Sequence, residues 1–143
     1  MKSEAVIYER YGKPLFIDEI VLDPPGPHEV AIKVNASGIC GSQLINLANK
    51  NSLNPEILGH EATGIVLQAG SHVEHVSEGD DVIVSWMPYG ATEKTNYLEW
   101  CNAVSWRHNR LRTLIFSWAR HAVMHSQFVS KMDSDLNKKS AAV

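Results

Sequence analysis

The feature that most constrains this chain is a pair of glycine-flanked segments that carry a thiol, an imidazole and a carboxylate. The first reads Gly38-Ile39-Cys40-Gly41-Ser42, and the second reads Gly59-His60-Glu61, followed by Gly64, Gly70 and Val73. Cysteine, histidine and glutamate are all zinc ligands, and a catalytic zinc typically takes three protein ligands and leaves one position open. The helical H-E-x-x-H motif of metalloproteases is not met, because Gly64 occupies the place of its second histidine.

Length and charge limit the classes of protein to consider. A chain of 143 residues with 44% hydrophobic and 20% charged residues predicts one globular domain over residues 1–143. A net charge of −3 argues against a nucleic-acid partner. No apolar run reaches the roughly 20 residues that cross a bilayer, so no membrane partner is expected. Two cysteines make no disulfide framework, and a reducing cytoplasm is the expected location.

Short β-rich runs separated by glycine and proline turns make up most of the chain. The run 28–36 alternates, with Val30, Ile32 and Val34 on one face and polar residues on the other, which is typical of a half-buried strand. Many short strands with such turns favour a mainly β fold, a small barrel or sandwich. The predicted strands are 5–8, 15–21, 28–36, 62–68 and 81–86.

Two helical segments are predicted around these strands. Residues 41–50 form a short helix with Ser42 as its N-cap, which places Cys40 at a helix N-terminus where the dipole favours a thiolate. A second helix is expected to start at Ser134. Residues 88–112 carry no clear pattern and receive no assignment. Trp86 and Trp118 lie in strand-like runs and are predicted to be core.

Among the remaining histidines, one pair has a spacing that could suggest a metal site. His121 and His125 are four residues apart, which on a helix would make a metal pair, but their neighbours predict a strand. Solvated or core histidines are therefore favoured. His72 and His75 flank a turn and are expected at the surface.

Together the two segments resemble the N-terminal, GroES-like domain of the zinc-dependent medium-chain alcohol dehydrogenases. That family carries G-H-E-x-x-G-x5-G-x-x-V, which residues 59–73 match at every named position, and G-I-C-G-S/T, which residues 38–42 match. The resemblance runs from about Ala5 to the C-terminus and is weakest between Pro88 and Ile115. It implies a GroES-like, partly open β-barrel with short helices. A Rossmann domain is not expected within the chain, because the sequence has no G-x-G-x-x-G turn.

The resemblance also implies roles for four residues. Cys40 and His60 would hold zinc, Glu61 would bind the metal directly or stand just behind it, and Ser42 would relay the alcohol proton. Each residue has a structural alternative: Cys40 as a small buried hydrophobe, His60 as a hydrogen-bonded structural residue, Glu61 as an exposed strand-end carboxylate and Ser42 as a helix cap.

Two positions depart from the family pattern. Gln43 stands where the family commonly has an acidic residue that orients the zinc-bound histidine, and an amide adds no charge there. Ile45 stands where many members have a histidine that passes the proton to solvent. The family's structural zinc, held by four close cysteines, is not predicted because only Cys101 lies in that region.

The activity that follows from the resemblance is zinc-assisted, NAD(P)-dependent interconversion of a small alcohol and its aldehyde or ketone. No G-x-G-x-x-G turn occurs in the sequence, and the family's third firm ligand is missing, so the chain is expected to be a C-terminally truncated catalytic half, inactive alone. The alternative is a non-catalytic GroES-like module, or a decayed remnant, that acts only by association through open strand edges, as a homo-oligomer for example.

Overall fold

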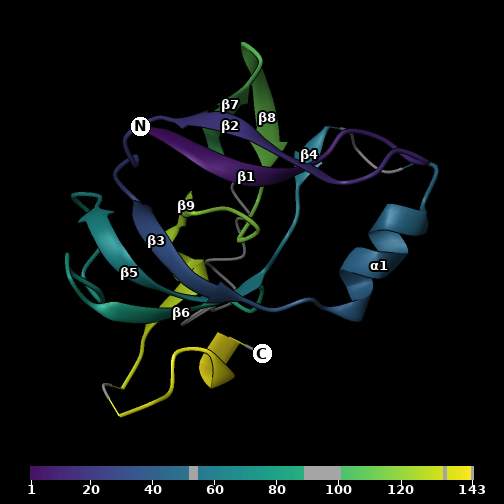
Figure 1. The fold of residues 1–143 in the computed structure, drawn as a ribbon. Helices are drawn as coiled ribbons and strands as arrows, with labels where there is room; N and C mark the ends of the chain where they lie inside the picture. Colours follow the sequence, from purple (N-terminus) through teal and green to yellow (C-terminus); the bar gives the residue numbers. More distant parts are fainter. Residues whose placement is uncertain (52–54, 89–100, 134, 143) are drawn as a thin grey trace.

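Two five-stranded antiparallel sheets face each other in the computed structural model, which describes residues 1–51, 55–88, 101–133 and 135–142 (Figure 1). The side chains of residues 101, 102 and 112 lie outside the description. The first sheet has the order β4-β1-β2-β7-β8 and the second has the order β10-β6-β5-β3-β9. Their bounds are β1 Lys2–Tyr8, β2 Phe16–Leu22, β3 Glu29–Ser37, β4 Glu56–Ile57, β5 Glu61–Ala69, β6 Asp81–Ser85, β7 Cys101–Trp106, β8 Asn109–Thr113, β9 His121–His125 and β10 Val129–Lys131.

The second sheet is built on β3 and β5, which carry the two motif segments at their ends. Val30, Ile32 and Val66 are each at most 1% exposed, while Lys33 faces solvent, as the alternating pattern predicts. The pairing of β3 with β5 runs from Val30 opposite Ala69 to Ser37 opposite Ala62. The register therefore brings the segment after Ser37 next to the start of β5.

The segment before β9 joins the two sheets. Ala119 bridges Ala5 of β1, and the Val6 amide donates to the Trp118 carbonyl at 2.8 Å. The Arg120 amide donates to Glu4, and the Arg120 carbonyl accepts from Val34 of β3, both at 2.9 Å. These bonds close one side of a barrel, so the predicted mainly β, partly open barrel is confirmed. Its core consists of apolar residues from both sheets, among them Ile7, Ile20, Ile32, Val66, Val82, Val104, Phe116, Met124 and Phe128.

Residues 101–113, left unassigned by sequence, contain a β-hairpin. β7 and β8 pair from Trp106 opposite Asn109 back to Cys101 opposite Thr113. The turn residues Arg107 and His108 both have positive φ, 47° and 67°. A two-residue turn of this kind usually contains asparagine and glycine, so Arg-His gave no turn pattern to recognise.

The helical elements are short, and two expectations about them were wrong. The helix α1 spans Gly41–Ala48 and ends two residues before the predicted boundary. Within residues 135–142 the predicted C-terminal helix is reduced to one 3₁₀ turn, η2 (Ser140–Ala142), because the Asn137 side chain accepts the backbone amides of Lys139 and Ser140. The other 3₁₀ turn, η1, is Ser126–Phe128. In the described part of the chain, no helix has the length and apolarity to cross a membrane.

The two tryptophans predicted to be core are not buried. Trp86 is 59% exposed because β6 ends at Ser85, so the alternation of inward- and outward-facing side chains no longer applies to it. Trp118 is only half-buried. Among the described tryptophans the buried one is Trp106, 6% exposed, whose indole N–H donates to Asp18 at 2.9 Å and lowers the pKa of that carboxyl.

Phe116 anchors the core beneath the segment that joins the sheets. It is 0% exposed, whereas Ile17 on β2 is 69% exposed. Phe116→Ala should lower the free energy of unfolding by about 3–5 kcal/mol, because a buried aromatic leaves a cavity. Ile17→Ala, the matched control, should change it by less than about 0.5 kcal/mol. Urea unfolding followed by circular dichroism measures both, and similar losses in the two variants would contradict this packing.

Candidate metal centre

Cys40 is the N-cap residue of α1, and the bond that fixes it comes from Gln43. The Gln43 Oε1 accepts the Cys40 amide at 2.8 Å, and the Gln43 amide donates to the Cys40 carbonyl at 3.1 Å. The first of these bonds is the one that a capping box makes, in which the side chain of the third helical residue reaches back to the backbone amide of the cap. Ser42, predicted to be the N-cap, is the second residue of the helix and is exposed. That capping prediction was wrong.

The buried side of α1 also differs from a usual amphipathic helix. Among its residues only Gln43 is buried, whereas Leu44 and Ile45 are 58% and 73% exposed. The helix therefore meets the barrel through a polar side chain and shows aliphatic side chains to solvent beside Cys40. Ile45 cannot carry a proton, so no relay to solvent runs through this position.

His60 and Glu61 enter the site at the start of β5, directly after Gly59. The φ of Gly59 is +102°, a region that side-chain-bearing residues rarely adopt. A Cβ on Gly59 would lie 2.4 Å from the Ser117 Oγ and 2.7 Å from the Trp118 amide nitrogen. Glycine at this position is thus a condition for the approach of residues 58–61 to residues 117–118.

Backbone hydrogen bonds hold three segments together around these side chains. The Leu58 carbonyl accepts the amides of Ser117 and Trp118 at 3.2 and 2.9 Å. The Glu61 carbonyl accepts the Gly38 amide at 2.8 Å and the Ser37 hydroxyl at 3.1 Å. Two further hydrogen bonds join Ser37 Oγ to Ser117 Oγ at 2.7 Å and Trp118 Nε1 to the Gly38 carbonyl at 3.1 Å. We call the hydrogen-bonded residues 37–38, 58–61 and 117–118 the frame. These hydrogen bonds tie the two motif segments to each other and to residues 117–118.

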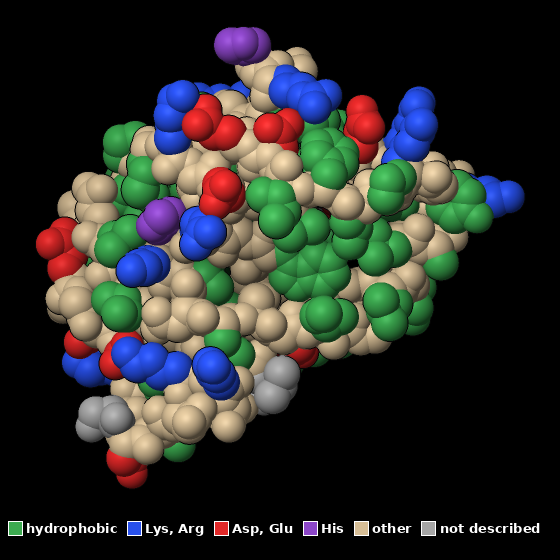
Figure 2. All heavy atoms as spheres, viewed as in Figure 1, with side chains coloured by type: hydrophobic (Ala, Val, Ile, Leu, Met, Phe, Trp, Pro, Cys, Tyr) green, Lys and Arg blue, Asp and Glu red, His purple; other side chains and the backbone are tan. Residues whose placement is uncertain are grey.

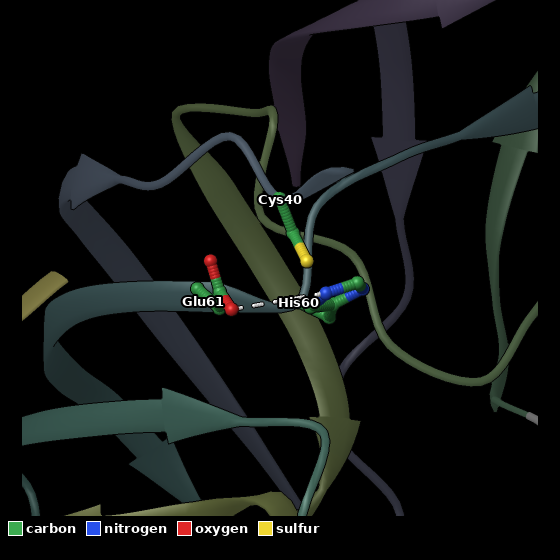
Figure 3. A group of neighbouring side chains, drawn as sticks. All are labelled: Cys40, His60 and Glu61. Carbon is green, nitrogen blue, oxygen red and sulfur yellow. Dashed lines mark ion pairs between the residues drawn. The ribbon is translucent and has the colours of Figure 1, made fainter. Parts of the chain in front are cut away.

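The frame brings Cys40, His60 and Glu61 together. One ligand atom from each, a sulfur, a ring nitrogen and a carboxylate oxygen, lies within 4.8 Å of the others, and this is the only such trio among the described residues. Figure 3 shows the Cys40 sulfur pointing from its loop toward the His60 ring, with Glu61 beside it on β5. His60 Nε2 and Glu61 Oε1 are 4.0 Å apart, and their side chains are 20% and 32% exposed.

The donor set fits zinc in type and in number. Around a tetrahedral zinc, neighbouring N, O and S ligands lie roughly 3.3–3.6 Å apart, so a side-chain movement of about 1 Å would close the trio on one ion. A thiolate, a carboxylate and a neutral imidazole balance the double charge of the metal. Partial exposure leaves an entry path and a fourth position.

A cavity of about 320 Å³ lies beside the trio and contains both Ser42 and His60 in its lining. Leu58, Leu114 and Ile115 supply apolar surface, and Asn46 and Glu56 lie at a polar part. Burial raises the pKa of Glu56, and the 2.8 Å hydrogen bond from the Asn46 amide partly offsets that shift. The Gln43 Nε2, also buried, has no hydrogen-bond partner among the residues that the structure describes. This space can accept a small molecule with both apolar and polar groups.

An open apolar groove of about 600 Å³ adjoins the frame on the side of β1 and β2. Leu15, Ile17, Val34, Ile39 and Trp118 are among its lining residues. Figure 2 shows hydrophobic side chains gathered between β1 and α1 on this face of the molecule. The surface next to the candidate centre is therefore largely apolar, with the Arg120–Glu4 ion pair in its lining.

The other candidate residues from the sequence do not belong to this centre. His121 and His125 both lie on strand β9, as the sequence favours. His121 Nδ1 is 3.0 Å from the Ser3 hydroxyl, and burial together with Lys33 and Arg120 lowers its pKa. The Cys101 side chain lies outside the described residues. Sequence reasoning missed Ser37, Ser117 and Trp118 as the frame, and only the C-x-x-Q spacing of a capping box could have indicated Gln43.

Comparison with known proteins tests the resemblance. Residues 26–134 match the model of the alcohol dehydrogenase GroES-like domain. The chain belongs to this family. The GroES-like domain is 42% identical over 91 residues to alcohol dehydrogenase class-2 isozyme 2 of Oryctolagus cuniculus and 37% identical over 90 residues to alcohol dehydrogenase-like 7 of Arabidopsis thaliana. These matches take in 62% of this chain but only 24% and 23% of the relatives.

Solved structures share the fold over nearly the whole GroES-like domain. Benzyl alcohol dehydrogenase of Acinetobacter calcoaceticus superposes with a TM-score of 0.81 at 22% identity, covering 96% of this chain and 43% of that one. A cinnamyl alcohol dehydrogenase of Sorghum bicolor gives 0.76 at 24% identity, covering 99% and 44%. The GroES-like architecture is thus confirmed, and it corresponds to less than half of each of these chains.

Gly59 offers a test of the frame that positions His60. Gly59→Ala should lower the free energy of unfolding by about 2–4 kcal/mol, because its Cβ meets Ser117 and Trp118 and its φ is strained. Gly41→Ala is the control, since nothing lies within 4 Å of a Cβ there and the residue is helical. It should shift stability by less than about 1 kcal/mol. Thermal unfolding of the two variants decides, and an unperturbed Gly59→Ala protein would contradict the frame.

Proposed function

We propose that this GroES-like domain is the catalytic, metal-binding domain of a zinc-dependent oxidoreductase that interconverts a small alcohol and its aldehyde or ketone with NAD(P). The observation that carries the proposal is the convergence of Cys40, His60 and Glu61 from two separate motif segments. Family membership and alcohol dehydrogenase relatives support it. The convergence of a thiol, an imidazole and a carboxylate at a partly exposed place favours a common ligand over three separate structural roles.

Cys40 and His60 would be the permanent ligands, and Glu61 the exchangeable one. The Cys40 backbone is held by Gln43 and that of Glu61 by Gly38 and Ser37, so the backbone positions from which the two ligand side chains start are fixed relative to each other. When bound, zinc supplies Lewis acidity to an alcohol or carbonyl oxygen. Gln43 cannot supply the charge of a carboxylate behind His60, which predicts a weaker site than one with an acidic residue there.

Ser42 would orient the substrate. Its hydroxyl lines the same cavity as His60, within reach of a small alcohol placed there. A serine hydroxyl both donates and accepts hydrogen bonds, so it can hold the substrate O–H and take up its proton. Leu58, Leu114 and Ile115 would exclude water from the carbon chain of the substrate.

Hydride transfer requires a dinucleotide site that this sequence does not contain. Without a G-x-G-x-x-G turn, the domain would act only together with a cofactor-binding domain, and alone it would be inactive. We propose that residues 1–143 form a single catalytic domain of a cytoplasmic enzyme. Homo-oligomerisation stays a prediction.

Zinc content tests the site directly. The chain, grown with zinc and gel-filtered in metal-free buffer, should retain about one zinc per molecule by inductively coupled plasma mass spectrometry. Cys40→Ser should retain less than about one tenth, since it removes the thiolate. Cys101→Ser, which changes the other cysteine, and Ser42→Ala should both retain the metal. Absence of zinc from the unsubstituted chain would reject the site and leave the association module as the better account.

A further inference from the structure

Three histidines from distant parts of the sequence meet at the end of β3 and β5 opposite to the candidate metal centre. His28 precedes β3, His72 lies in the turn after β5, and His125 is the last residue of β9. The centroids of the His28 and His72 rings are 4.7 Å apart, and those of His28 and His125 are 6.0 Å apart in a near-parallel stack. Chain folding, not sequence proximity, creates this cluster.

Backbone bonds hold the three segments in place. The His72 amide donates to the Pro27 carbonyl, the Gly70 amide to the Glu29 carbonyl and the Ser126 amide to the His28 carbonyl, each at 2.9 Å. Gly70 allows the turn to come close, because a Cβ there would lie 2.1 Å from the Gly26 carbonyl oxygen. The imidazoles are therefore presented from a rigid base, which is what a metal site needs to avoid an ordering cost.

The decisive distance is between two ring nitrogens. His28 Nε2 and His72 Nδ1 are 3.2 Å apart, and both side chains are exposed. A metal ion at 2.0–2.1 Å from each nitrogen would see them at an angle of roughly 100°, which suits two neighbouring positions in a tetrahedral or square arrangement. The alternative is a single N–H···N hydrogen bond between neutral rings, which has the same distance.

The neighbouring histidines cannot take the place of this pair. His75 Nε2 lies 3.1 and 3.0 Å from the carbonyl oxygens of Ser126 and Val129, so that nitrogen carries a proton. His125 Nδ1 accepts the Gln127 amide at 3.2 Å, which places the proton of the neutral ring on Nε2. His125 thus stacks on His28 and fixes the plane of its ring without being a ligand.

We propose that His28 Nε2 and His72 Nδ1 form a second metal site, for a divalent transition metal ion such as Zn²⁺, with water in the remaining positions. Imidazole is a preferred ligand of Zn²⁺, Cu²⁺ and Ni²⁺. β5 runs from Glu61 to Ala69, and its eight steps of about 3.3 Å put the far end of the strand at most roughly 26 Å from Glu61. Figure 1 shows the two ends of β5 on opposite sides of the second sheet. The site is independent of the proposed activity.

Bound metal would link the loop before β3 to the turn after β5. With only two protein ligands the site is weaker than the Cys40 centre and would lose its ion during gel filtration in metal-free buffer. It should therefore be measured at equilibrium. Because it binds the folded chain only, Zn²⁺ at this pair should also raise the unfolding temperature.

Equilibrium dialysis of the full chain against Zn²⁺ tests the proposal. The unsubstituted chain should bind one Zn²⁺ more than either His28→Gln or His72→Asn, and Cys40→Ser should keep this second equivalent while losing the first. His108→Asn is the matched control, since His108 is an exposed histidine at positive φ, a conformation that asparagine accepts. It should bind as the unsubstituted chain does.

A second measurement does not depend on the substitutions. In NMR spectra of the unsubstituted chain, Ni²⁺ should broaden the ring C–H signals of His28 and His72 at concentrations about tenfold below those that affect His108. Equal Zn²⁺ binding by all histidine variants, or simultaneous broadening of His28, His72 and His108, would overturn the proposal and leave the N–H···N hydrogen bond as the explanation of the pair.

Discussion

The structure depends on one junction, at which residues 58–61 are hydrogen-bonded between residues 37–38 and residues 117–118. The Leu58 carbonyl takes two amides from the segment that joins the sheets, and the Glu61 carbonyl takes the Gly38 amide and the Ser37 hydroxyl. Leaving such a buried group without a partner costs about twice the free energy that the bond contributes net when it is formed. The same junction closes the barrel and places His60 and Glu61 next to Cys40. The fold and the candidate site therefore depend on the same residues.

The chemical properties of the candidate site follow from the side chains that surround this junction. Cys40 stands at the start of α1, held by the Gln43 side chain, and the helix turns aliphatic residues to solvent. The three donor atoms are therefore presented in a partly open, largely apolar setting beside a cavity that contains Ser42. A metal held there would act in surroundings of low polarity, where charge stabilisation is stronger than in water.

Sequence reasoning was most successful where residue type and spacing leave few alternatives. The alternating residues of 28–36 predicted β3, which the structure confirms. The glycine-flanked motifs predicted a shared function for Cys40, His60 and Glu61; the structure brings these side chains together, and their function stays a prediction. Sequence reasoning failed where a local pattern was absent or a side chain competed with the backbone. Arg107-His108 makes a tight turn without glycine, and Asn137 takes amides that a helix starting at Ser134 would need.

Other parts could not be predicted from one sequence at all. The histidines at positions 28, 72 and 125 meet only because three strands bring their ends together, and the sheet register was not known beforehand. The frame of Ser37, Ser117 and Trp118 has the same origin. Long-range pairing decides these contacts, whereas periodicity and turn residues report only on neighbours in the sequence.

We propose that Cys40, His60 and Glu61 bind a single metal ion at the mouth of the barrel. Anomalous diffraction from crystals of the zinc-grown chain, collected on both sides of the zinc absorption edge, tests it most directly. We expect a strong anomalous peak at bonding distance from the Cys40 sulfur and from a His60 ring nitrogen. A fully formed barrel with no peak there, or a peak that touches neither residue, would contradict it.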